Sequence, residues 1–370
     1  MQKPTPQRFL PLDVFRGLTV CFMIIVNTPG WEDSYYILTH AKWNGCTPTD
    51  MVFPSFLFAV GNAMSFSMRK FEQMESNAVL AKILRRTVLI FLLGYLMYWL
   101  PFVRYTAAGW EFIPIAETRI LGVLQRIALC YCLASLLIYY LPKKAVWIVS
   151  GLLLVGYWLI MYAFGDYSLT GNAALAADKF VLGDKHLYHG EGIPFDPEGL
   201  LSTLPAIVNV IAGYYTGLYL QKAGSTGTSL TRLLQAGCLL IAAALVWNLA
   251  FPINKKLWTS SYVLYTVGID LLILAILNYV IDHKKQDKWT GFFTVFGKNP
   301  LFLYLLSEVL VIFMNFIQVN QISVYRWINV NIFQRLAPGK PGSLLFALVF
   351  MLLCWSVGKV LDKKRIYVRV

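Results

Sequence analysis

Charged side chains are scarce in this sequence of 370 residues: Asp, Glu, Lys and Arg make up 14% of it, against about 25% in ordinary soluble domains. Hydrophobic residues make up 58%, and the mean hydropathy is +0.59. The sequence also lacks any loop long enough to form a soluble domain. These shortages exclude a water-soluble globular protein and predict an integral membrane protein.

Cysteine and histidine patterns typical of metal and disulfide sites are also lacking. Five of the six cysteines fall inside apolar runs, the sequence has no CxxC pair, and no set of His and Cys shows ligand spacing. We therefore expect the cysteines to pack as small hydrophobic residues, and we expect no metal.

The net charge of +13 would suit nucleic-acid binding if the chain were soluble. Here the Lys and Arg residues lie between apolar runs and mostly on one side, which is the pattern of the positive-inside rule. The sequence therefore predicts contact with a lipid bilayer and no nucleic-acid partner.

Ten apolar runs are long enough to cross a bilayer, which needs about 20 residues each time. The short basic loops alternate with longer loops rich in Trp, Gly and Pro, so we expect both termini in the cytoplasm. The predicted fold is all-α, with about ten transmembrane helices in a single polytopic domain over residues 1–370. The runs are 12–28, 48–68, 83–102, 120–140, 146–164, 200–220, 233–251, 262–281, 292–316 and 343–360.

The first run follows a basic segment that superficially resembles a signal peptide. Asp13 and Arg16 interrupt it and no small-residue cleavage site follows, so we expect it to be kept as the first span. Asp13 and Arg16 would share a helix face and could pair. A favourable helix start for Asp13 and snorkelling for Arg16 would explain both residues without a function.

The loop after the first span holds the leading candidate for chemistry. His40 suits a general base near neutral pH, and Trp43 and Asn44 beside it could hold a sugar through its ring face and its hydroxyls. Asn27, at the outer end of the first span, could donate a hydrogen bond to a developing oxyanion. A structural hydrogen bond is the alternative for a lone histidine, but the polar neighbours, which include Asp50, favour a functional site.

Arg126 lies inside the fourth run, where a charge is costly. An anion such as a phosphate, a cluster of carbonyls, or an ion pair with Asp13, Asp50 or Glu308 could satisfy it. Residues 297–300 interrupt the ninth run with Gly and Pro, whose freed backbone groups need protein or a cavity at membrane depth.

Seven short blocks occur in family order along nearly the whole chain. They resemble the catalytic membrane domain of the heparan-α-glucosaminide N-acetyltransferase family, which belongs to the transmembrane acyltransferases. The blocks are LDVFRG (12–17), HAKWNG (40–45), DMVFPSF (50–56), GVLQRI (122–127), DPEG (196–199), NK with WTSS (254–255 and 258–261) and GKNP (297–300).

The resemblance implies that an acetyl group passes from cytosolic acetyl-CoA to the amine of a glucosamine across the membrane. It assigns His40 as the catalytic histidine and Asn27 as its companion, here joined by a slightly longer loop, and it implies a homodimer. The CoA-binding candidates are Arg16, Gln125, Arg126, Lys298 and Asn299. The sugar-binding candidates are Trp43, Asn44, Asp50, Asp196, Glu198, Asn254, Lys255 and Trp258.

Lysosomal members of that family carry an added lumenal domain before the first span, and this sequence shows none. We therefore expect a bacterial inner (cytoplasmic) membrane protein, with the active histidine near the outer face and a free amino sugar or cell-wall fragment as acceptor. Direct transfer and a two-step route through acetyl-histidine are both open. The alternative functions are a transporter or exporter of a small sugar-like solute, and a membrane scaffold without chemistry.

Overall fold

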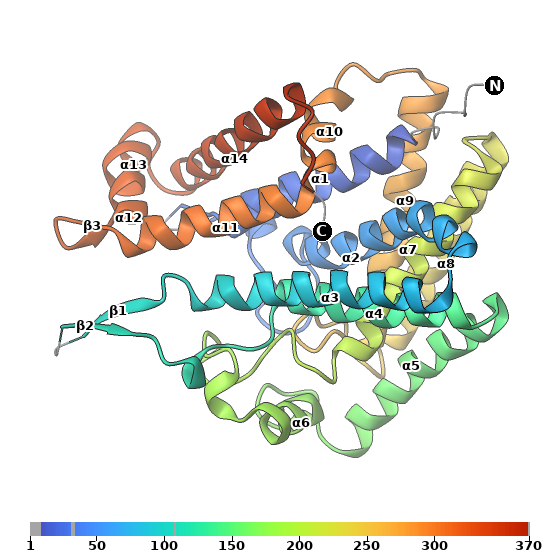
Figure 1. The fold of residues 1–370 in the computed structure, drawn as a ribbon, viewed down its shortest axis with the longest axis horizontal. Coiled ribbons are helices and arrows are strands. Elements are labelled where there is room, and N and C mark those ends of the chain that lie inside the picture. Colours follow the sequence, from blue (N-terminus) through green and yellow to red (C-terminus); the bar gives the residue numbers. More distant parts are fainter. Residues whose placement is uncertain (1–8, 31–33, 107–108, 369–370) are drawn as a thin grey trace.

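The computed structural model describes residues 9–30, 34–106 and 109–368, and it shows a bundle of long helices (Figure 1). The four short strands of this part form only two hairpins, β1 (Val103–Thr106) with β2 (Gly109–Phe112) and β3 (Gln318–Val319) with β4 (Ile322–Ser323). The prediction of an all-α membrane protein is confirmed. The helices are α1 (Leu10–Asn27), α2 (Pro48–Ser67), α3 (Ser76–Trp99), α4 (Val123–Tyr140), α5 (Lys143–Ala163), α6 (Ala173–Leu182), α7 (Thr203–Ala223), α8 (Gly227–Trp247), α9 (Ser260–Asn278), α10 (Thr290–Lys298), α11 (Pro300–Phe316), α12 (Val324–Ile328), α13 (Gln334–Leu336) and α14 (Lys340–Lys363).

Each predicted run coincides with a long helix, except the ninth, which forms the pair α10 and α11. Within the described residues, seven helices are long and apolar enough to cross a membrane, or eight if α10 and α11 count as one bent span. Among the other predicted runs, the third and the sixth correspond to α3 and α7. The count of ten spans and the cytoplasmic termini stay predictions.

The break between α10 and α11 bends the chain by 82°. Pro300 has no N–H to donate to the preceding turn, so it ends α10 and starts α11. Glycine lets α10 approach α1 closely at this point. A Cβ at Gly17 would overlap the carbonyl of Phe293, and one at Gly297 would overlap the carbonyl of Asp13. The predicted interruption at residues 297–300 is therefore confirmed, and it lies against the first turns of α1.

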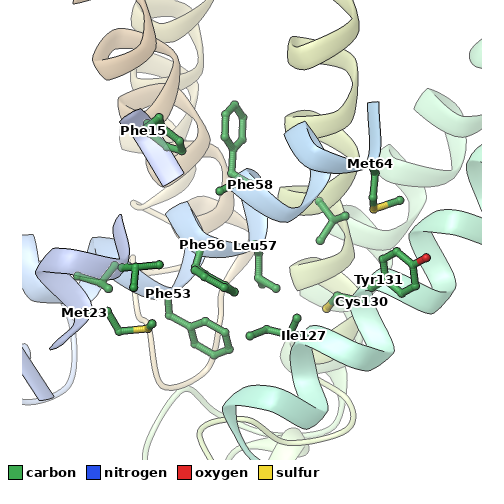
Figure 2. Packing of buried hydrophobic residues seen from close by; sticks show 14 of the residues in the cluster. Phe15, Met23, Phe53, Phe56, Leu57, Phe58, Met64, Ile127, Cys130 and Tyr131 are labelled. Atoms are coloured by element: carbon green, nitrogen blue, oxygen red, sulfur yellow. The ribbon is translucent and has the colours of Figure 1, made fainter. Parts of the chain in front are cut away.

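The core is built around α2, the most buried of the candidate spans. Figure 2 shows Phe53 and Leu57 on the side of α2 that faces Ile127 of α4. On the opposite side Phe58 packs edge-on against Phe15 of α1, with ring centroids 5.8 Å apart. In lipid such interdigitation, more than water exclusion, holds helices together. The packing fixes α2, and with it the residues at the N-terminus of α2.

Candidate active site

A histidine and an aspartate are paired at the N-terminus of α2. Thr47 caps this helix and Asp50 is its third residue, so the two form a reciprocal capping box. Asp50 Oδ2 accepts hydrogen bonds from the backbone N–H groups of Thr47 and Ala41, each at 3.0 Å, and Oδ1 lies 2.7 Å from His40 Nδ1. Because an ionised carboxylate can only accept, Nδ1 donates its proton to Asp50, and in the neutral form of the ring the lone pair is on Nε2. The helix cap thus orients the imidazole.

Lys255 joins this pair from the loop between α8 and α9. Gly45 N–H donates to the carbonyl of Ile253 at 2.7 Å, and the Asn254 amide donates to Asn44 Oδ1 at 3.2 Å, so two distant loops are fastened together. Lys255 Nζ consequently lies 3.0 Å from Nδ1 and 3.3 Å from Nε2 of the histidine ring. The nearly equal distances to both nitrogens place the ammonium against the ring.

The side chains of His40, Lys255 and Asp50 differ in how far they are exposed. The side chain of His40 is 47% exposed, against 17% for Lys255 and 1% for Asp50. Burial lowers the pKa of the Lys255 ammonium, although Asp50 and Glu198 oppose that shift. His40 is therefore the group that an incoming molecule can reach, and the less exposed Asp50 and Lys255 contact its ring.

Asn27 ends α1, and its side chain bonds a residue of α11. Its side-chain amide donates to Glu308 Oε1 of α11 at 3.0 Å, whereas His40 is held by Asp50 and Lys255. Asn27 remains exposed. The structure therefore ties Asn27 to α11 and does not bond it to the histidine, so its predicted catalytic role stays a prediction.

Two of the predicted sugar-binding carboxylates are already engaged by Arg119. This guanidinium donates to both oxygens of Asp196, at 2.6 and 2.9 Å, and to Glu198 at 2.6 Å. The rings of Tyr98 and Tyr188 each lie 4.8 Å from its centre. Burial opposes ionisation of Glu198, but Arg119 and other nearby cations lower its pKa. The geometry indicates an ion cluster, and the predicted sugar contacts of Asp196 and Glu198 stay a prediction.

Arg126 contacts a carbonyl, a hydroxyl and a ring, while its Nε and Nη1 atoms are buried without a hydrogen-bond partner among the described residues. It donates to the carbonyl of Gly199 at 2.9 Å and to the hydroxyl of Ser202, and it lies 4.8 Å from the centre of the Trp258 ring. The structure shows one carbonyl partner for Arg126, and a bound anion for the remaining nitrogens stays a prediction. Arg126 lies in the first turn of α4, beside the loop before α7.

Among the other predicted sugar-binding residues, the structure separates buried from accessible ones. Trp258 is fully buried and donates from its indole to Asn209, and Asn254 is also buried, so neither presents a free surface. Trp43 is half-buried, with its indole bonded to the carbonyl of Tyr167, and Asn44 is exposed. Trp43 and Asn44 therefore remain the candidates beside His40.

A separate cavity of about 360 Å³ lies between α1, α2, α3, α4 and the break before α11. Three cations line it. Arg16 lies 3.7 Å from Asp13, which confirms the predicted pairing, and Lys298 is bonded to Asp362 at 2.7 Å. The third, Arg86, lies 4.7 Å from the ring centre of Tyr131. A carboxylate partner for Arg86 is not found among the described residues, so this cavity can receive an anion.

The predicted CoA-binding residues divide between this cavity and other parts of the bundle. On α4 the cavity is lined by Leu124, Ile127 and Tyr131, which share one helix face, while Gln125 and Arg126 lie outside its lining. The predicted CoA contacts of Gln125 and Arg126 therefore stay a prediction without support from this cavity. Asn299 acts indirectly. It bonds the carbonyl of Ile366 at 3.0 Å and the N–H of Val368 at 2.8 Å, which holds the C-terminal segment as a wall.

Sequence reasoning missed two features of these sites. Arg86 lies just inside the third predicted run, a position where an ionisable residue is itself a signal, but it was counted with the inner loop. Asp50 was assigned to sugar binding, although its place ahead of an apolar run after Thr47 is typical of a helix cap. Among the described residues, no three His, Cys, Asp or Glu side chains gather as metal ligands.

Fold and site together define an all-α polytopic membrane protein that carries a histidine-based polar site and a separate cation-lined cavity. The family model described as heparan-alpha-glucosaminide N-acetyltransferase, catalytic, matches residues 8–185. The human heparan-alpha-glucosaminide N-acetyltransferase is 30% identical over 364 residues, which cover 82% of this chain and 53% of the human protein. The mouse protein of the same name is 30% identical over 369 residues, which cover 84% and 54%.

The chain is therefore a relative of heparan-α-glucosaminide N-acetyltransferase, and the resemblance inferred from the seven blocks is confirmed. It spans about half the length of the curated relatives that it matches. The relationship supports a transmembrane acetyltransferase family, and the match to the catalytic family model includes both His40 and Asp50.

Proposed function

We propose that this protein transfers an acetyl group from acetyl-CoA to the amine of a glucosamine-type sugar on the other side of the membrane. The observation that carries the proposal is the accessible His40 ring, oriented by the buried Asp50 at 2.7 Å. An accessible imidazole whose Nδ1 is fixed by a carboxylate is a suitable general base.

The cation-lined cavity is the proposed donor site. Arg16, Arg86 and Lys298 would face the phosphates of CoA, since charge-assisted hydrogen bonds to phosphate are strong and directional. The deeper wall is apolar and suits the thin pantetheine arm. Phe56 marks this wall on α2 and follows Asp50 by six residues, or about 9 Å of helix, so the arm would have a short path to the histidine.

The proposed reaction is acyl transfer. The amine nitrogen attacks the thioester carbonyl carbon, a C–N bond forms, and the C–S bond breaks. His40 Nε2 takes the proton released by the amine and returns it to the departing thiolate, so CoA leaves as its thiol. The Lys255 ammonium, 3.3 Å from Nε2, would stabilise the negative charge that develops on the carbonyl oxygen.

Trp43 and Asn44 are the proposed contacts of the acceptor, because they flank the histidine on the same loop and remain accessible. We propose a free amino sugar or a cell-wall fragment as acceptor. The bacterial inner membrane, the outer position of His40 and the homodimer belong to the same proposal.

The test is transfer across a sealed membrane. Protein in liposomes receives labelled acetyl-CoA on one side and glucosamine on the other, and labelled N-acetylglucosamine is measured. His40→Ala should abolish transfer and keep CoA binding, while His189→Ala, in an exposed loop position, should behave as wild type. Full activity in His40→Ala would remove this residue from the mechanism. Flux of sugar without acetyl-CoA would favour the transporter.

A further inference from the structure

A second large cavity, of about 450 Å³, lies away from both sites, between α5, α7, α8 and α9. Ala212 and Thr216 of α7 line it with Val267 of α9, and Ala236 and Leu239 of α8 line its opposite side. Leu239 is 71% exposed and Ala236 is also exposed, so the cavity is a groove on the surface of the bundle.

The groove has apolar walls and a basic end. Lys143 opens α5, and Arg232 lies in the second turn of α8; both are exposed and both line the groove. Within the described part of the chain, neither forms an ion pair with a carboxylate. Helix stability does not explain Lys143, because a cation at a helix N-terminus faces the positive end of the helix dipole. The basic end is therefore complementary to an anionic ligand.

The length of the groove matches one leaflet. From Tyr219 to Val208 it follows α7 for 11 residues, or about 16 Å of helix. Half of the hydrocarbon core of a bilayer is about 15 Å. Near the basic end Trp147 stacks on Tyr215, with ring centroids 5.0 Å apart and an interplanar angle of 29°. Such aromatic residues are typical of the headgroup level of a membrane.

We propose that this groove is a binding site for one anionic phospholipid. Its headgroup phosphate would contact Lys143 and Arg232. One acyl chain would lie along α7, between Ala212 of α7 and Ala236 of α8. A second copy of the chain is a less suitable occupant of the groove. In a two-fold dimer with its axis along the membrane normal, the two basic ends would lie at the same depth, so like charges would meet. The inference does not rest on the proposed acetyl transfer.

The test uses defined lipids on the purified, delipidated full chain. Native mass spectrometry would compare phosphatidylglycerol with phosphatidylcholine of identical acyl chains. Wild type should retain phosphatidylglycerol preferentially. The double variant Lys143→Gln/Arg232→Gln should bind it about tenfold more weakly, since each basic residue near an anionic surface contributes modestly. Lys144→Gln removes an adjacent exposed charge that does not line the groove, and it should leave affinity unchanged.

A second pair of variants tests the acyl chain without changing charge. Ala236→Phe would fill the groove and should abolish retention of phosphatidylglycerol, whereas Ala242→Phe, exposed on another face of α8, should not. Thermal unfolding of each variant checks that it remains folded. Equal affinity for both lipids, or unchanged affinity in the double variant, would overturn the proposal. So would a dimer that dissociates on Ala236→Phe, because the occupant would then be a second copy.

Discussion

Asp50 Oδ1 and His40 Nδ1 lie 2.7 Å apart, and the other oxygen of the same carboxylate caps α2 through the N–H of Thr47. One aspartate therefore fixes both the start of a membrane helix and the orientation of the ring above it. A change at this residue should alter activity and stability together, and the two effects can be separated.

Asp50→Asn should lower the rate of acetyl transfer by about a hundredfold to ten-thousandfold, because an amide can hold the ring in the wrong tautomer. The rate is measured with saturating acetyl-CoA, and CoA binding should be unchanged. Thr47→Val is the matched control. It removes the hydroxyl bond to Asp50 and destabilises α2, but it keeps the His40 contact. Equal loss of activity in both variants would show that the helix cap, and not the pair, matters.

Lys255→Met should lower the rate by about tenfold to a hundredfold, as loss of an oxyanion donor does elsewhere. The ammonium form acts, and burial lowers the pKa of Lys255 below the ordinary value of a lysine. Wild-type activity should therefore fall on the alkaline side as this group loses its proton, and the variant should lack that limb in a pH–rate profile. Lys42→Met, on the exposed part of the His40 loop, is the control. An unchanged alkaline limb in Lys255→Met would contradict this role.

Arg86→Gln should raise the dissociation constant of CoA by about tenfold, because a hydrogen bond to a charged group contributes roughly 1.5–3 kcal/mol. Binding is measured by calorimetry in detergent. Arg85→Gln changes the neighbouring exposed arginine, which does not line the cavity, and should leave binding intact. If the two variants bind CoA equally well, the cavity is not the donor site.

Gly297→Ala should destabilise the protein by about 1–3 kcal/mol, because its Cβ would overlap the carbonyl of Asp13 and push α10 away from α1. Arg16 donates to the Gly297 carbonyl at 3.2 Å, so the KM for acetyl-CoA should rise as well. Gly291→Ala, in the same helix with open space at its Cβ, should instead be neutral or slightly stabilising. Thermal unfolding measures both, and an equal effect in the two variants would refute close packing as the cause.

Asp178 should make stability fall as the pH rises. Burial raises the pKa of this carboxyl from 3.8 to about 7, against the opposing hydrogen bond from Leu200 N–H. Between these values the folded state binds more protons than the unfolded state, so the free energy of unfolding decreases with pH. Asp178→Asn keeps an acceptor for Leu200 and should flatten the dependence between pH 4 and 7 by a few kcal/mol. Parallel unfolding curves of wild type and variant would disprove it.

Much of the fold could be predicted from the sequence because bilayer thickness sets the length of apolar runs. The helix break at residues 297–300 could also be predicted, since Gly and Pro have a direct effect on the backbone. The partners of polar side chains could not. Asn27 bonds Glu308, which is 281 positions away, and only the packing of α1 on α11 brings them together. Arg126 bonds the carbonyl of Gly199 because the fold brings the two together, and the sequence pattern of side chains does not indicate which backbone group will be near.

The bond between Gly45 N–H and the carbonyl of Ile253 has a consequence for biosynthesis. His40 and Asp50 emerge from the ribosome early, yet Lys255 is made only after seven further helices, α2 to α8. A nascent or truncated chain that stops before Lys255 would hold the histidine loop without its cation. Under the proposed function, such a chain would be inactive until the loop between α8 and α9 has been made and placed against the His40 loop.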